Sequence, residues 1–318
     1  MRFNLINFES EGIILQMNKT KHQKVWIELS KNAIVENFNT MKELKGATAP
    51  FVNVTANALG FGLSSFVRGL IAANVSGFTV NSLSEAIFLR RLGTNKDILV
   101  FEPASAENAF EMADEFITAT VDSLKELKKI ASKLHSKFPL NVFLSRNMFN
   151  KKEAKSICLQ HPNQFDLKGF YYLNQKSDDN FGGKYFSIKT KKEDYIFGTS
   201  IYGMTNQPSL KSVLRLCTKI VQINSAKIII PIGFKDGLSS SFKGFSFPLN
   251  GKKVEILDID LNFSTISNPG LPESTHQIPI FDLNDENNII KASEFIRIYP
   301  WELSTRLNSS IPRQLIYN

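Results

Sequence analysis

The 318-residue chain has few of the side chains that form disulfides or bind metals, with only two cysteines and four histidines. Cys158 and Cys217 lie far apart in the sequence, and neither they nor the histidines show the short spacings of metal ligands. We therefore expect two buried or inert thiols, as in a reducing compartment, and no metal site.

Long apolar runs are also lacking, and none approaches the length of a membrane span. The first eleven residues include two glutamates and no continuous apolar stretch, so no secretory signal is expected. A net charge of +8 could indicate a nucleic-acid partner, but the lysines are spread along the chain and form no dense basic block. The sequence predicts a cytoplasmic protein that binds neither membrane nor nucleic acid.

Hydrophobic residues make up 42% of the chain, which is enough for a large core and for two domains. From Phe51 onwards, short apolar runs alternate with amphipathic stretches, a pattern that predicts parallel strands and helices closed into a barrel. Before it, Val25–Leu29 alternates like a strand, and Ser30 is placed to cap a helix. The predicted barrel strands are 51–54, 77–80, 98–101, 117–121, 141–144 and 168–173, and the predicted helices are 64–73, 84–92, 106–114 and 123–134.

The residue pattern changes after residue 205, where predicted extended segments are separated by glycine, proline, serine and asparagine. We predict a leader at 1–24, a barrel domain at 25–205 and a smaller β-rich domain at 206–318. The strand at 25–29 is expected to pack with the β-rich domain.

The segment 51–62, Phe-Val-Asn-Val-Thr-Ala-Asn-Ala-Leu-Gly-Phe-Gly, resembles the alanine racemase signature Val-Lys-Ala-Asn-Ala-Tyr-Gly-His-Gly. Further segments resemble later motifs of that family in the same order, namely 77–86, 198–203, 230–237, 301–303 and 311–313. The resemblance implies a fold-type III (β/α)8 TIM-like barrel followed by a β domain, and a head-to-tail homodimer. It also implies racemisation of alanine on pyridoxal phosphate.

The resemblance further implies where the family's chemical groups would lie, and this chain has other residues there. The cofactor lysine falls on Thr55, the signature tyrosine and histidine on Leu59 and Phe61, the arginine facing the pyridine nitrogen on Ile196, its supporting histidine on Leu173, and the phosphate tyrosine on Trp301. The loop that carries the catalytic tyrosine is deleted between Ser225 and Lys227, and only the backbone N–H groups of Gly198 and Thr199 remain for a phosphate. A Schiff base needs an amine, and inversion needs a base on each face.

We therefore predict no intact catalytic residue, no cofactor, and a remnant pocket made of Thr55, Leu59, Ile196, Gly198, Thr199 and Trp301. The favoured interpretation is a catalytically inactive pseudoenzyme that serves as a structural or interaction protein, still a homodimer, with room for an unknown protein partner. Two alternatives stay open. One is an active alanine racemase that interconverts L- and D-alanine for peptidoglycan precursors, and the other is a small-molecule binder that uses the remodelled apolar pocket.

The seventh barrel strand has no clear counterpart in the sequence. Lys184–Lys189 alternates apolar and polar residues and shortly precedes Ile196–Ile201, the expected eighth strand. A barrel that lost a strand would expose two strand edges. We therefore expect either a reduced seventh unit or the pairing of 184–189 in its place.

Overall fold

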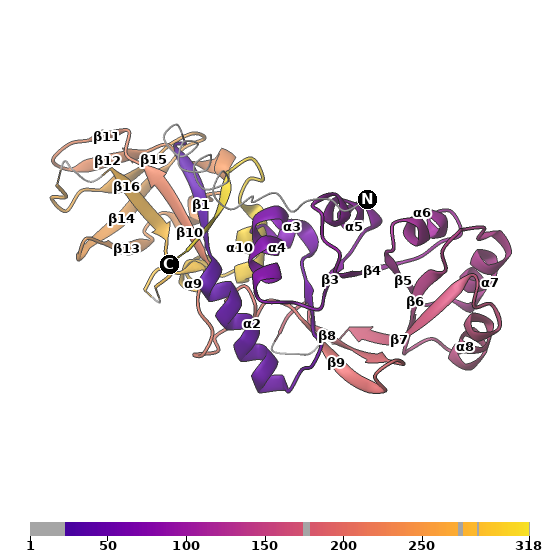
Figure 1. The fold of residues 1–318 in the computed structure, drawn as a ribbon. Coiled ribbons are helices and arrows are strands. Elements are labelled where there is room, and N and C mark those ends of the chain that lie inside the picture. Colours follow the sequence, from indigo (N-terminus) through magenta and orange to yellow (C-terminus); the bar gives the residue numbers. More distant parts are fainter. Residues whose placement is uncertain (1–22, 174–178, 273–275, 285, 318) are drawn as a thin grey trace, which may run out of the picture. The chain divides into compact units, whose positions relative to one another are not determined.

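The computed structural model describes residues 23–173, 179–272, 276–284 and 286–317, so residues 1–22 of the predicted leader lie outside the described residues. The chain forms two compact units, whose elements are labelled in Figure 1. Ser30–Val213 make up almost all of one unit, and the other combines the residues up to Leu29 with Leu214–Ile316.

The first unit is a closed barrel in which the strands β2 to β9 follow one another in chain order. Strands β2 to β7 pair in parallel with one another, and β9 pairs in parallel with β2, with Ile196 opposite Phe51. The predicted barrel is confirmed, and the six predicted strands agree with the structure to within a few residues. The strands are β2 (Phe51–Asn53), β3 (Gly77–Val80), β4 (Asp97–Pro103), β5 (Thr118–Val121), β6 (Leu140–Ser145), β7 (Phe165–Leu173), β8 (Gly183–Ser187) and β9 (Lys192–Phe197).

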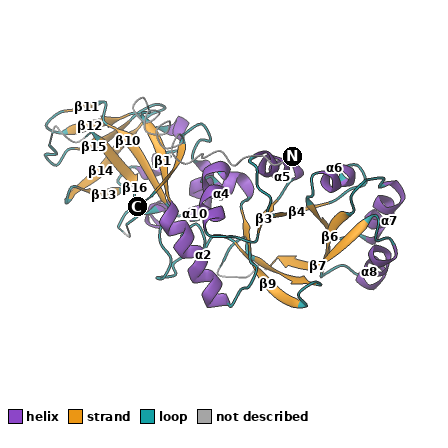
Figure 2. Ribbon diagram, viewed as in Figure 1, coloured by secondary structure: helices purple, strands orange, loops and turns teal. Residues whose placement is uncertain are grey.

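Helices run along the outside of the parallel part of the barrel (Figure 2). The cap of α2 is the predicted one, because the Ser30 Oγ accepts a hydrogen bond from the Ala33 N–H at 3.1 Å. The sequence did not predict α8, whose buried residues are only Ala154 and Cys158, so its apolar period is weak. The helices are α2 (Lys31–Lys45), α4 (Leu63–Ala72), α5 (Leu83–Arg91), α6 (Ala109–Asp114), α7 (Leu124–Lys133) and α8 (Lys151–Gln160).

An antiparallel strand takes the place of the seventh β/α unit. β8 runs antiparallel to both β7 and β9, so Tyr185 lies opposite Tyr171 on one side and Asp194 on the other. None of the described residues between β7 and β9 is helical. The expectation that 184–189 supplies the missing strand is confirmed, and the ladders on both sides leave this strand no free edge.

The prediction of an eighth strand at Ile196–Ile201 is wrong in its bounds. β9 begins at Lys192 and ends at Phe197, and the chain then turns through residues 199–203. The ladder stops there because the next backbone N–H groups, beginning with that of Gly198, donate to residues outside the sheet.

The substitute strand also contributes to the core of the barrel. The ring of Tyr185 lies 5.0 Å from that of Phe51 and 5.6 Å from that of Phe143, and its hydroxyl donates to the Ala49 carbonyl. Aromatic rings at these separations stabilise a core beyond the burial of their area. The packed interior of the barrel consists of Phe51, Leu99, Phe143, Tyr171, Tyr185 and Ile196.

The second unit contains two sheets, and the predicted β-rich domain is confirmed. One has the strand order β16-β10-β1-β17, in which β1 pairs antiparallel with β10 from Val25 opposite Thr218 to Leu29 opposite Leu214. The other has the order β11-β12-β15-β14-β13. The elements are β1 (Val25–Ser30), β10 (Leu214–Lys219), β11 (Gln222–Ile223), β12 (Lys227–Ile230), β13 (Ser246–Leu249), β14 (Lys252–Ile259), β15 (Ser264–Ser267), β16 (Gln277–Phe281), β17 (Arg313–Ile316), α9 (Ile289–Ile296) and α10 (Pro300–Arg306).

Replacing Gly169 tests the close approach of β7 and β8. A Cβ added at this residue would lie 1.8 Å from the Phe186 carbonyl oxygen. We expect Gly169→Ala to lower the free energy of unfolding by at least about 2 kcal/mol, measured by urea denaturation, because the strands must shift apart. The control Lys168→Ala, at a half-exposed neighbour, should cost less than about 1 kcal/mol. Equal costs would contradict this packing.

Candidate functional site

The chain leaves β2 through a left-handed turn, labelled α3 (Thr55–Leu59). Residues 56–59 have φ values between +49° and +56°, and Gly60 and Gly62 follow at +83° and +95°. A left-handed conformation costs about 1–2 kcal/mol for each residue that carries a Cβ. Such strain persists only where the surrounding contacts enforce it, and it is concentrated at functional loops.

Glu85, in the first turn of α5, holds this strained turn. Its carboxylate accepts hydrogen bonds from the Thr55 hydroxyl at 3.2 Å and from the Ala56 N–H at 2.7 Å. The same carboxylate accepts from the Asn81 N–H at 3.0 Å and forms a capping box with Ser82. One carboxylate therefore ties the end of β2 to the end of β3.

Aromatic packing holds the far side of the turn. Phe61 is fully buried and meets the rings of Phe66 and Tyr202 edge-on, with centroids 5.8 and 5.0 Å apart. The rings of Phe66 and Tyr202 stack at 4.1 Å, and the Tyr202 hydroxyl donates to the Asn53 carbonyl at 2.8 Å. Leu59 is also buried, at 2% exposure. Apolar packing thus encloses Leu59 and Phe61, whereas Ala56 and Asn57 at the start of the turn are exposed.

A second carboxylate, that of Asp179, holds the end of β9. It accepts from the N–H groups of Gly198 and Ser200, each at 2.8 Å, and the N–H between them, that of Thr199, donates to the Asn180 carbonyl at 2.9 Å. Successive backbone N–H groups pointing to one side form the arrangement that binds phosphate and other anions in proteins. Here the chain's own oxygens accept from all three.

The carboxyl of Asp179 has an altered acidity. Burial raises its pKa above the ordinary value for aspartate, and the hydrogen bonds from Gly198 and Ser200 lower it to a smaller extent. The backbone N–H groups therefore bind a carboxyl group that holds its proton more tightly than an exposed aspartate would.

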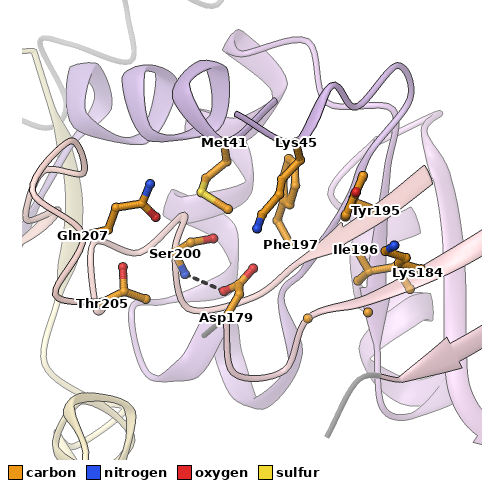
Figure 3. Close-up of a pocket in the computed structure, with 12 residues that line it drawn as sticks. Met41, Lys45, Asp179, Lys184, Tyr195, Ile196, Phe197, Ser200, Thr205 and Gln207 are labelled. Carbon is orange, nitrogen blue, oxygen red and sulfur yellow. Dashed lines mark hydrogen bonds between the residues drawn. The ribbon is translucent and has the colours of Figure 1, made fainter. Parts of the chain in front are cut away.

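A cavity of about 270 Å³ lies beside Asp179 (Figure 3). Figure 3 shows Lys45 and Met41 reaching it from α2, with Asp179 and Ser200 joined by a hydrogen bond. Its lining also includes Lys184 and Gln207. The cavity is therefore polar as well as apolar, and Ile196 is the one predicted pocket residue that lines it.

The structure brings some of the predicted pocket residues together. Because β2 and β9 are neighbours in the barrel, Thr55 and Leu59 follow one strand end while Gly198 and Thr199 follow the next. Ile196 packs into the barrel interior. The side chain of Leu173 lies outside the described residues.

Trp301 and the segment Ser225–Lys227 belong to the other unit. Trp301 lies on α10, and its ring stacks on that of Tyr299 with centroids 5.4 Å apart. Between β11 and β12 the connection is a tight turn, in which the Asn224 Oδ1 accepts from the Lys227 N–H at 2.8 Å.

Both carboxylates that hold the strand ends were missed by the sequence analysis. Glu85 had a detectable signal, since Ser82 and Glu85 have the spacing of a capping box. Asp179 had none, because nothing local indicates that a loop aspartate will accept from backbone N–H groups 19 and 21 residues later.

Among the described residues, no cluster of three or more histidine, cysteine, aspartate or glutamate side chains could hold a metal ion. Within the same residues, no helix combines the length and the apolar character needed to cross a bilayer.

Comparison with known proteins finds that this chain is similar to alanine racemases. Residues 29–148 match the family model "Alanine racemase, N-terminal domain". An alanine racemase of Listeria monocytogenes is 25% identical, and the match covers 93% of this chain and 99% of that protein. Crystal structures of alanine racemases from Oenococcus oeni and E. faecalis have TM-scores of 0.80 and 0.79, each at 20% identity, and cover 92% and 93% of this chain and 100% and 99% of theirs. The fold is that of the alanine racemases.

Removal of the Asp179 carboxylate should destabilise the barrel. We expect Asp179→Ala to lower the free energy of unfolding by about 2–3 kcal/mol, because two N–H groups lose a charged acceptor. Urea denaturation measures the change. Asp166→Ala, which removes an exposed carboxylate of β7, is the control and should cost less than about 1 kcal/mol. Similar losses of unfolding free energy in the two variants would show that the hydrogen bonds of Asp179 do not stabilise the barrel.

The raised pKa of Asp179 gives a stability difference that depends on pH. A carboxyl with a raised folded-state pKa stabilises the fold most below its unfolded-state pKa of about 4, and this contribution declines as pH rises through the folded-state value. Wild type should therefore gain stability relative to Asp179→Asn as pH falls from 7 towards 4. Denaturation curves of both proteins across this range measure the difference. A gain in the opposite direction would contradict the raised pKa.

Proposed function

We propose that this chain, whose residues 29–148 match the alanine racemase N-terminal domain and whose fold is that of the alanine racemases, is a non-catalytic protein. It does not bind pyridoxal phosphate covalently and acts as a structural or interaction protein. This proposal rests above all on one observation, the occupation by Asp179 and Asn180 of the N–H groups that would hold a phosphate.

The anchor for the cofactor supports the same proposal. Thr55 stands where the resemblance places the lysine, and its buried hydroxyl is engaged with Glu85 at 3.2 Å. A hydroxyl cannot form the imine that attaches pyridoxal phosphate to a protein. Without that bond the cofactor would depend on phosphate contacts, whose N–H donors already have partners within the chain. The residues present therefore do not fit the cofactor.

The remaining chemical groups also favour a non-catalytic protein. Racemisation by removal and return of a proton needs one base on each face of the substrate. Only Asn224, Ser225 and Ala226 connect β11 to β12, so there is no room for the tyrosine-bearing loop. Ile196, in the place of the arginine that faces the pyridine ring, packs in the barrel core.

The scaffold that is retained is consistent with a role in assembly. The family to which the chain is similar forms homodimers, and we propose that this chain does so too. Replacement of buried charges by apolar side chains removes their desolvation cost and so stabilises the fold of a protein that does not carry out the reaction.

Alanine racemisation is the second candidate function. The observation that favours it is the match to a curated alanine racemase over 93% of this chain and 99% of the relative. The site would then need to supply an amine and two bases from residues other than those that the resemblance indicates.

Mixing the purified protein with pyridoxal phosphate separates the two candidates. We expect wild type to show no visible band of lysine-bound cofactor, no cofactor retained after borohydride reduction, and no D-alanine formed from L-alanine. A band that survives reduction in wild type, with D-alanine formation, would overturn the proposal in favour of racemisation. Reduced protein that carries the cofactor can be digested to identify the lysine.

Two variants test the role of Asp179 in the same experiment. Thr55→Lys restores an amine, and Thr55→Lys/Asp179→Ala also frees the N–H groups of Gly198 and Ser200. We expect the double variant to retain at least about tenfold more reduced cofactor than Thr55→Lys, since two charge-assisted hydrogen bonds to phosphate become available. Thr55→Lys/Asp166→Ala is the matched control. Equal retention by all three variants would show that Asp179 does not block the phosphate.

A further inference from the structure

A second cavity, of about 330 Å³, lies between α8 and the strands β7 to β9. Its floor consists of the rings of Phe170, Tyr172 and Phe186. These residues alternate along their strands with Tyr171 and Tyr185, which point into the barrel interior. The floor is therefore the outer face of the barrel. None of its lining residues lines the cavity beside Asp179.

This face is open because of the antiparallel substitution described above. In a regular β/α barrel a helix follows each strand and covers its outer face. Here β7, β8 and β9 follow one another antiparallel, and the described residues between them form no helix. Phe170, Tyr172 and Phe186 consequently keep part of their ring surface accessible to solvent.

The rim of this cavity carries an excess of positive charge. Its charged residues are Arg146 and three lysines against a single carboxylate, Glu193. Arg146 forms an ion pair with that carboxylate at 2.7 Å, and its guanidinium also lies 4.9 Å from the ring centre of Tyr172. The three lysines are left with no acidic group on the rim.

The lysines are those at positions 151, 152 and 155 in the first turns of α8, and all three are exposed. Among the described residues, none of them forms an ion pair. Glu153, on the same helix, pairs instead with Lys128 at 2.7 Å. Lys151 and Lys155 are four residues apart, and like charges at this spacing destabilise a helix. An anion bound at the rim would relieve that repulsion.

We propose that this cavity binds a small anion with an apolar, ring-containing body. The rings of the floor contact the body of the ligand, and the lysines of α8 bind its carboxylate, sulfate or phosphate group. The volume lies within the range of small-molecule sites, which is about 300–1,000 Å³. Aromatic walls with a few charged groups at one edge are typical of sites that orient an amphipathic ligand. The proposal is independent of the function proposed above.

Anilinonaphthalene sulfonate is a suitable probe, because it combines two aromatic ring systems with one sulfonate. Its uncharged counterpart, phenylnaphthylamine, has the same rings without the charge. We expect the sulfonate to bind folded wild type at one site per chain, at least about tenfold more tightly than the uncharged probe. Fluorescence titration measures both affinities. Equal affinities would overturn the proposal, because the lysines would then contribute nothing.

Paired variants locate the site. Lys151→Glu/Lys155→Glu should weaken binding of the sulfonate at least about tenfold and leave phenylnaphthylamine unchanged. Lys125→Glu/Lys133→Glu makes the same charge change on exposed positions of α7 and should have little effect. If the α7 variant weakens binding as much as the α8 variant, the attraction is that of the whole protein and the proposal fails.

Truncation of the floor completes the test. Phe186→Ala should weaken both probes, whereas Phe149→Ala, at a ring that is 99% exposed and outside the cavity lining, should weaken neither. Thermal unfolding of each variant confirms that it is folded at the titration temperature, and Tyr172→Ala replaces Phe186→Ala if that variant is unfolded. Unchanged affinity in a folded floor variant would overturn the proposal.

Discussion

Backbone N–H groups at the carboxyl ends of barrel strands need acceptors, and in this chain two carboxylates supply them. Glu85 accepts from the residues that follow β2 and β3, and Asp179 accepts from Gly198 and Ser200 after β9. In this fold the same end of the barrel is where ligands bind. When the chain's own carboxylates accept from the N–H groups at a strand end, no ligand is needed to complete those hydrogen bonds. This constraint determines the hydrogen bonding of the site.

The left-handed turn after β2 is held by one carboxylate and by aromatic packing. Four successive residues with positive φ would be unstable alone, but Glu85 and the packed rings of Phe61 and Tyr202 hold them. Burial of Phe61 stabilises the turn by roughly 1.5–3 kcal/mol, comparable to the strain of one or two of those residues. The geometry of the turn is therefore maintained by packing and by one carboxylate, to which the Thr55 hydroxyl also donates.

The sequence predicted the features that depend on local pattern. The Ser30 cap, the barrel strands and the substitute strand at 184–189 all follow from alternation or from capping chemistry, and the structure confirms them. The end of β9 could not be predicted in the same way, because it is fixed by Asp179 across a loop rather than by the residues from Ile196 to Ile201. The polar cavity beside Asp179 was missed for the same reason, since α2, which forms one of its walls, is distant in sequence from β8 and β9, which form the others.

Amide hydrogen exchange at Gly198 and Ser200 tests the central claim most directly. If Asp179 already satisfies these N–H groups, both should be protected in the protein alone, and added pyridoxal phosphate should leave their exchange rates and NMR shifts unchanged. Rapid exchange of these N–H groups in the free protein that becomes slow when pyridoxal phosphate is added would show that they bind an external phosphate. That result would contradict the account.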